Sequence, residues 1–122
     1  MADILIVDDN TNFRKMLKHI LLSRFPAMHI REAQDADAAL QNTETLVPDL
    51  IFMDMRLPGA NGIQLTKKIK AANPGVIIIM ITNYDTPEYR EAALESGADF
   101  FVSKKASTAE DVLAQVESIF PL

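Results

Sequence analysis

Apolar runs of strand length alternate with segments of helical periodicity along the whole chain. Each run is followed by apolar residues that recur at spacings of three and four. The run from Val76 to Ile81 is apolar at every position, which is typical of a parallel strand covered on both faces. Strict alternation predicts one α/β domain, a parallel sheet with helices on both faces. The five predicted strands are Asp3–Val7, Met28–Ala33 (near a sheet edge), Leu50–Met53, Val76–Ile81 and Phe100–Val102.

Capping and breaking residues delimit the predicted helices. Asp35 caps the second helix, Thr86-Pro87 opens the fourth, and Ser107 or Thr108 caps the fifth. Gly97 stops the fourth helix, Pro121 follows the fifth, and Leu57–Gly62 reads as turns before the third. We expect Lys67, Lys68 and Lys70 in solvent, and Met53 and Met80 in the core. The helical residues expected to pack inward are Phe13, Met16, Leu17, Ile20, Leu21, Ala36, Ala39, Leu40, Leu65, Ile69, Val112, Val116 and Ile119.

Composition and charge narrow the class of protein. The 122 residues, 48% hydrophobic and 24% charged, suit one globular domain over residues 1–122. The chain has no cysteine and no basic leader, and its longest apolar run is too short to span a membrane, so we expect a cytoplasmic protein. A net charge of −5 without a basic stripe argues against nucleic-acid binding.

Chemically capable side chains follow the predicted strands. Asp8 and Asp9 follow the first strand, Asp54 the third, Thr82 the fourth and Lys104 the fifth. Ligands of open α/β sheets bind beyond the carboxyl ends of the strands, so these residues should converge. Each alone is more often a cap or a turn residue, but together they form a coherent set. Three carboxylates repel one another unless a cation lies among them, and Mg²⁺ prefers oxygen ligands. The pattern therefore predicts a site at which a carboxylate accepts a phosphoryl group.

Three segments carry a resemblance to a known family. Ile4–Asp9 is similar to the opening strand of that family, which ends in an acidic pair. Asp54–Pro58, together with Gly62, is similar to the family's phosphoacceptor strand and the loop after it. Thr82 matches the position of a hydroxyl residue in the family, and Gly97–Lys104 resembles the segment that leads to the family's lysine. Together these motifs resemble the receiver domains of two-component response regulators. The resemblance implies a flavodoxin-like fold with the strand order 2-1-3-4-5.

The resemblance also implies a metal and a reaction. Asp8, Asp9 and Asp54 would hold Mg²⁺ together with the backbone carbonyl of Arg56. Asp54 would take a phosphoryl group from the phosphohistidine of a sensor histidine kinase or phosphotransfer protein. Lys104 and Thr82 would bind the transferred group. Such a chain is not a conventional enzyme, although it catalyses its own phosphorylation and dephosphorylation.

A switch and a partner surface are implied as well. Thr82 would move toward the phosphoryl oxygens while Phe101 rotates inward behind it; plain core packing is the alternative for Phe101. The face made by the fourth helix, the fifth strand and the fifth helix would then change its affinity for a protein effector or output domain. The same face could form a homodimer.

The chain departs from the family pattern at two positions. Lys105 stands where the family usually has a proline, and Asn83 where it usually has a small residue. Met55, Arg56, Asn83 and Tyr84 are expected to flank the site and to influence access and hydrolysis. Three alternatives stay open: a flavin electron carrier, a hydrolase with an aspartyl-phosphate intermediate, and a degenerate receiver that acts only as an interaction module.

Overall fold

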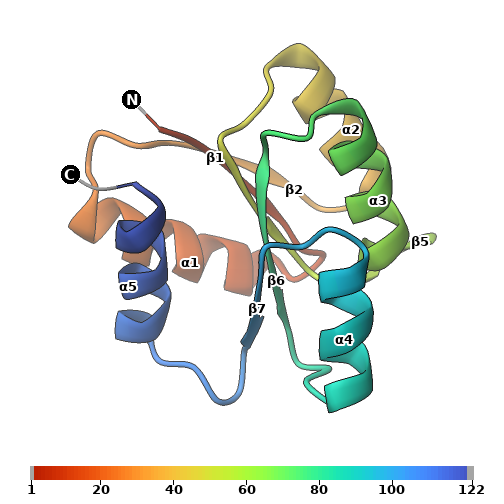
Figure 1. The fold of residues 1–122 in the computed structure, drawn as a ribbon. Coiled ribbons are helices and arrows are strands. Elements are labelled where there is room, and N and C mark those ends of the chain that lie inside the picture. The colour runs from red at the N-terminus through yellow and green to blue at the C-terminus, as the bar shows by residue number, and fades with distance from the viewer. Residues whose placement is uncertain (1, 121–122) are drawn as a thin grey trace.

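The parallel sheet lies between two layers of helices (Figure 1). The computed structural model describes residues 2–120, so Pro121 and its predicted role at the end of the last helix lie outside it. The order of the main sheet is β2-β1-β3-β6-β7, and every neighbouring pair is parallel. Because β4 and β5 form a separate hairpin, this is the expected order 2-1-3-4-5. The strands are β1 Asp3–Val7, β2 His29–Ala33, β3 Leu50–Met53, β4 Arg56–Leu57, β5 Ala60–Asn61, β6 Ile77–Thr82 and β7 Phe100–Ser103.

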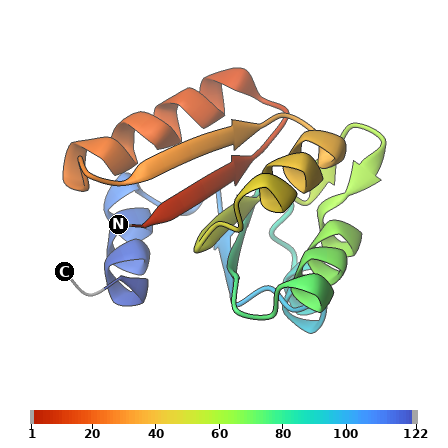
Figure 2. The ribbon, with the colours of Figure 1, turned by 90° about the horizontal axis from the view of Figure 1, so that it is seen from above.

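Helices α1 and α5 cover one face of the sheet, and α2, α3 and α4 cover the other (Figures 1 and 2). Successive strand residues point to opposite faces, so each strand contributes to both layers of the core. In β1, for example, Ile4 and Ile6 pack with the α1 and α5 layer, whereas Leu5 and Val7 pack with the other. Among residues 2–120, each helix is too short or too polar to span a lipid bilayer. The helices are α1 Thr11–Arg24, α2 Ala36–Thr45, α3 Gly62–Ala72, α4 Pro87–Glu95 and α5 Ala109–Ile119.

The predicted helix caps are confirmed. The Asp35 side chain accepts a hydrogen bond from the Ala38 amide at the start of α2. Thr86 caps α4 with Pro87 in the first helical position. Thr108, rather than Ser107, caps α5 and forms a reciprocal capping box with Asp111.

The prediction that Met16 belongs to the core is wrong. Met16 is 52% exposed, and the buried residues of α1 are Arg14, Leu17 and Leu21. Arg14, Leu17 and Leu21 are spaced at i, i+3 and i+7, so they form the stripe of α1 that faces the sheet. Met16 lies outside that stripe, and Arg14, which the predicted apolar pattern did not include, is buried within it.

The prediction that Lys70 is solvated is also wrong. Its side chain is only 18% exposed, and its ammonium lies 2.8 Å from a carboxylate oxygen of Asp99. The same Asp99 oxygen accepts a hydrogen bond from the Ile78 amide, so the ion pair links α3 to β6. Lys67 and Lys68 are exposed, as predicted.

The segment expected to consist only of turns contains the β4–β5 hairpin, which brings Gly62 back against the end of β3. The Gly62 amide donates a 2.6 Å hydrogen bond to the Met55 carbonyl oxygen. A Cβ atom on Gly62 would overlap the carbonyl oxygen of Asp54. Glycine at this position therefore allows the start of α3 to pack directly on the backbone of Asp54.

Gly62→Ala should lower the free energy of unfolding by about 1–3 kcal/mol, because the new methyl group forces the Asp54 backbone to move. Gly75→Ala is the matched control, since a Cβ atom there meets nothing within 4 Å. The control should be neutral or stabilising by up to about 1 kcal/mol. Urea unfolding of both variants measures the difference, and equal stability of the two would contradict the packing argument.

Candidate functional site

Backbone hydrogen bonds hold the predicted site residues at the carboxyl edge of the sheet. The amide of Asp8 donates to Ala33, and that of Asp54 to Val7, each over 3.0 Å. The amide of Lys104 donates to the carbonyl oxygen of Thr82 over 2.9 Å. Thr82 is itself the last residue of β6, so this strand ends one residue later than predicted. The sheet's hydrogen-bond pattern thus extends to the first residue after three strands and fixes where their side chains start.

Asp8, Asp9 and Asp54 form one acidic cluster. A carboxylate oxygen from each residue lies within 4.8 Å of those from the other two. Asp8 and Asp54 are buried, whereas Asp9 is exposed and leaves one side of the cluster open to water. An all-oxygen donor set with an open side fits a magnesium ion, which usually keeps several water ligands.

Lys104 is the positive charge nearest to this cluster. Its ammonium lies 2.6 Å from Asp8 Oδ2 and 3.5 Å from Asp54 Oδ2. It also lies 4.1 Å from the centre of the Phe13 ring, in a cation–π contact. Since one ammonium faces three carboxylates, a net negative charge is left for a further cation.

Asp8 is the most firmly held of the three acids. The Asn10 amide donates to its Oδ1 over 2.9 Å, and Lys104 occupies its Oδ2. Its backbone carbonyl accepts a 2.7 Å hydrogen bond from the buried guanidinium of Arg14. Arg14 was not identified from the sequence, although its helical spacing with Leu17 and Leu21 marks it as a charged residue in a core stripe.

Burial raises the pKa of the Asp54 carboxyl above its ordinary value of 3.8, and the negative charge of Asp8 raises it further. The Lys104 ammonium, the Thr82 side chain and the backbone of Arg56 act in the opposite direction but do not cancel the rise. The ionised form of Asp54 is therefore costly until additional positive charge approaches.

Thr82 and a neighbouring hydrogen bond shape the side of the site next to α4. Thr82 is fully buried, and its hydroxyl oxygen accepts a 3.3 Å hydrogen bond from the Tyr84 amide. The Ser103 hydroxyl donates to Asp85 over 2.8 Å, which ties the loop before α4 to the end of β7. Neither Ser103 nor Asp85 was identified from the sequence as a site residue. Ser103 lies within the Gly97–Lys104 segment, but its partner Asp85 is 18 residues away in the chain.

Three of the four predicted flanking residues lie on the rim. Asn83, Tyr84 and Arg56 are exposed, and the Arg56 guanidinium lies 4.3 Å from the centre of the Tyr84 ring. Tyr84 in turn makes an edge-to-face contact with Tyr89 of α4, with ring centres 5.9 Å apart. Met55 does not share this position, because its side chain is buried in the core beneath the α2, α3 and α4 layer.

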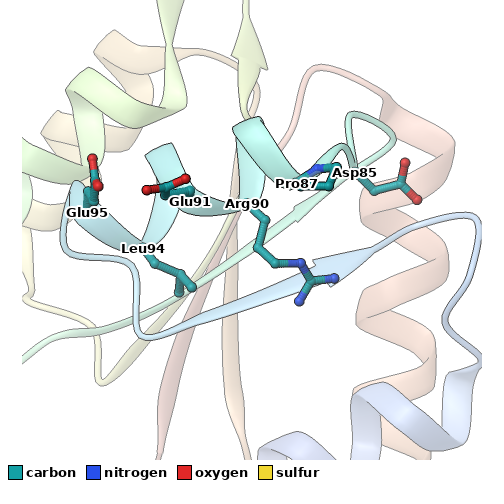
Figure 3. Close-up of a pocket in the computed structure, with 6 residues that line it drawn as sticks. All are labelled: Asp85, Pro87, Arg90, Glu91, Leu94 and Glu95. Carbon is teal, nitrogen blue, oxygen red and sulfur yellow. The ribbon is translucent and has the colours of Figure 1, made fainter.

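Phe101 is half-buried and packs at the edge of the core. The Arg90 guanidinium of α4 lies 5.0 Å from the centre of its ring. Arg90 also lines a shallow groove of about 710 Å³ along α4. In Figure 3, Arg90 and Leu94 extend to the β7 side of α4, whereas Glu91 and Glu95 point away from it. Phe101 is thus in contact with an arginine that lines this groove.

Lys105, which stands where the resemblance led us to expect a proline, is exposed. Residues 2–120 contain no cis peptide bond, as expected for a lysine at this position. Lys104 nevertheless reaches the acidic cluster, because its backbone amide is tied to Thr82. The departure at Lys105 therefore does not move Lys104 out of the site.

Comparisons with known proteins agree on one family. The model of the response regulator receiver domain matches residues 4–117. A cyclic di-GMP phosphodiesterase of Thermotoga maritima is 33% identical over 104 residues, which cover 85% of this chain and 27% of that protein. The transcriptional regulatory protein LnrK of Bacillus subtilis is 31% identical over 119 residues, covering 98% of this chain and 54% of that protein. The chain thus spans about half, or less, of the length of these relatives.

A solved structure gives the same result for the fold. The CheY-like receiver domain protein from Methanospirillum hungatei superposes with a TM-score of 0.87 at 30% sequence identity. The superposition covers 97% of this chain and 92% of that one.

Replacing Asp9 with alanine should weaken Mg²⁺ binding by more than roughly tenfold, since even partners of metal ligands are worth about 10–100-fold in affinity. Isothermal titration with MgCl₂ measures the dissociation constant. Glu44→Ala removes an equally exposed acid far from the cluster and should leave the constant unchanged. Equal affinities of Asp9→Ala and the native chain would remove Asp9 from the metal site.

At pH 7, with divalent cations chelated, Asp54→Asn should have a larger free energy of unfolding than the native chain. Because the folded pKa of Asp54 is raised, the folded chain binds more protons there than the unfolded chain. The stability contributed by this group is complete below about pH 3.8 and is lost as the pH rises through the folded pKa. The advantage of the variant should therefore shrink toward pH 4, as measured by urea unfolding. A stability advantage of Asp54→Asn that does not change with pH would contradict this account.

Proposed function

The chain belongs to the response regulator receiver domain family, and on that premise we propose that Asp54 accepts a phosphoryl group from a sensor kinase. The donor would be a phosphohistidine on the kinase or on a phosphotransfer protein. The observation that carries the proposal is the convergence of Asp8, Asp9, Asp54, Thr82 and Lys104 from four strands on one edge of the sheet. We take residues 1–122 as one receiver domain.

The transfer needs positioning and charge neutralisation more than covalent chemistry from the protein. A carboxylate oxygen of Asp54 attacks the phosphorus as the phosphorus–nitrogen bond to histidine breaks, and the bonding electrons leave with the imidazole. The reaction requires ionised Asp54, which is the form that its burial disfavours. The positive charges around Asp54 therefore also favour its reactive state.

Mg²⁺ suits the acidic cluster, and Asp8, Asp9 and Asp54 would hold it together with the backbone carbonyl of Arg56. When bound, the ion supplies positive charge that offsets the charge developing on the phosphoryl oxygens. The backbone of Arg56 lies close enough to Asp54 to lower its pKa, which places this segment beside the reacting carboxylate.

The Lys104 ammonium is placed so that it could move from Asp8 to a phosphoryl group on Asp54. Before transfer its ammonium is closer to Asp8, at 2.6 Å, than to Asp54, at 3.5 Å. A phosphoryl group on Asp54 would add negative charge on that side, so Lys104 would shift from Asp8 toward the new oxygens. Thr82, at the end of β6, would donate its hydroxyl hydrogen to another phosphoryl oxygen.

The rim residues would control how long the phosphoryl group survives. Arg56 of β4 and Tyr84 of the loop before α4 are in cation–π contact, and Tyr89 of α4 packs against Tyr84. Closing this cluster would restrict the approach of water to Asp54. Asn83 is exposed beside it and is free to contact the incoming donor.

Output would pass through the face formed by α4, β7 and α5. A shift of Thr82 toward the phosphoryl group leaves space into which Phe101 can rotate. That rotation would break the contact between Phe101 and Arg90 and alter the groove along α4 (Figure 3). The affinity of this face for a protein effector, an output domain or a second copy would then change by a population shift.

Incubation with Mg²⁺ and acetyl phosphate should add one phosphoryl group to the native chain and none to Asp54→Ala, because the acceptor is absent in the variant. Intact-mass measurement detects the change. Asp37→Ala, which removes an exposed acid of α2, is the control and should be phosphorylated like the native chain. Labelling of Asp54→Ala would place the acceptor elsewhere. No labelling of a folded, Mg²⁺-binding native chain, even by cognate kinases, would favour a degenerate receiver that acts as an interaction module.

A further inference from the structure

Arg14 occupies a place in the fold where an apolar side chain is expected. With Leu17 and Leu21, it forms the buried stripe of α1, and its side chain is only 10% exposed. Arginine is almost never buried unless it is paired, since removing its charge from water is costly. A charged residue in this stripe therefore needs a compensating set of contacts.

The guanidinium has three partners from three directions. Nη1 donates to the backbone carbonyl of Asp8 over 2.7 Å, and Nη2 donates to the Thr11 hydroxyl over 3.3 Å. Nε donates to a carboxylate oxygen of Glu32 over 3.1 Å. A planar fork of fixed donors is needed to satisfy all three at once, which arginine provides and lysine does not.

Glu32 orients Arg14 and pairs with its charge. It lies on β2, the strand next to β1, and is itself only 19% exposed. The ammonium groups of Lys15 and Lys18 each lie 3.8 Å from its second oxygen. Glu32 thus fixes the orientation of Arg14 from the neighbouring strand and balances its charge.

The contact with Asp8 is the one that reaches the site. Asp8 is 1% exposed, so without Arg14 its carbonyl oxygen would be buried with no partner in its present position. The other polar atoms of Asp8 are held by Ala33, Asn10 and Lys104. Lys104 would have to leave Asp8 when a phosphoryl group arrives, and Arg14 would then be the remaining side chain that holds this residue.

We propose that Arg14, oriented by Glu32, is a positioning residue that holds Asp8 and the adjoining Asp9 in the geometry required for Mg²⁺. The inference rests on the proposed function, because it assigns Asp8 and Asp9 to the metal. It extends the site to two residues, one on α1 and one on β2, that touch neither the ion nor the phosphoryl group. Loss of such a partner is expected to weaken metal binding by roughly 10–100-fold.

The test compares Mg²⁺ dissociation constants, measured by titration calorimetry with MgCl₂ alone at fixed ionic strength. The double variant Arg14→Met/Glu32→Gln removes one positive and one negative charge, so its net charge is unchanged and only positioning is lost. It should bind Mg²⁺ roughly 10–100-fold more weakly. Arg14→Lys keeps the charge without the fork and should also bind more weakly; it covers the case in which the double variant does not fold.

The matched control removes an ion pair at the other end of α1. Arg24 pairs with Glu117 and Glu110 of α5, so Arg24→Met/Glu117→Gln also preserves net charge and loses ionic contacts of the same helix. Its Mg²⁺ affinity should equal that of the native chain even where its stability falls. Amide exchange at Asn10, which donates to Asp8, should accelerate in the Arg14 variants and not in the control.

Native-like affinity in the double variant, or in Arg14→Lys, would overturn the positioning role. Failure of the native chain itself to bind Mg²⁺ would overturn the proposed function and this inference with it. The two failures are therefore distinguishable, because the first requires a native chain that binds the ion.

Discussion

Repulsion among three carboxylates at one edge of the sheet is the constraint on which the rest of the site depends. Asp8, Asp9 and Asp54 lie within a few ångströms of one another, and two of them are buried. The fold keeps them together with backbone hydrogen bonds that continue the sheet and with one ammonium that touches both buried acids. The resulting excess of negative charge is costly for folding and useful for function. In the proposed function, this excess charge would attract a divalent cation, and the ionisation of Asp54 would depend on that cation.

Much of this arrangement could be predicted from the sequence because it depends on local pattern. The apolar runs mark the strands to within one residue at either end, and the polar residue that follows each run lies at the carboxyl edge. Parallel topology then brings these residues together, however far apart they are in the chain. Asp35, Thr86 and Thr108 cap their helices through contacts three residues away, so they too were accessible to sequence analysis.

Two of the features that could not be predicted depend on partners that are distant in sequence. The burial of Arg14 depends on Glu32, which only the pairing of β1 with β2 brings beside it. The burial of Lys70 likewise depends on its ion pair with Asp99, which is distant in sequence. The β4–β5 hairpin could not be predicted because two-residue strands have no periodicity, and glycine and proline in that segment indicate turns equally well. For Arg14 and Lys70, a residue distant in sequence decides the burial, whereas the hairpin pairs residues only a few positions apart.

The two edges of the sheet differ in a way that bears on self-association through strand pairing. An edge strand offers unpaired backbone groups to any other extended chain, and charged side chains along it discourage such pairing. On β2, Arg31 and Glu32 provide these charges, and both are fixed by partners, Asp3 for Arg31 and Arg14 for Glu32. On β7, the corresponding residues Phe100, Phe101 and Val102 are apolar and half-buried. Glu32, which pairs with Arg14, thus also contributes a charge to the β2 edge of the sheet, and the apolar residues of β7 make that edge the more open of the two to strand pairing.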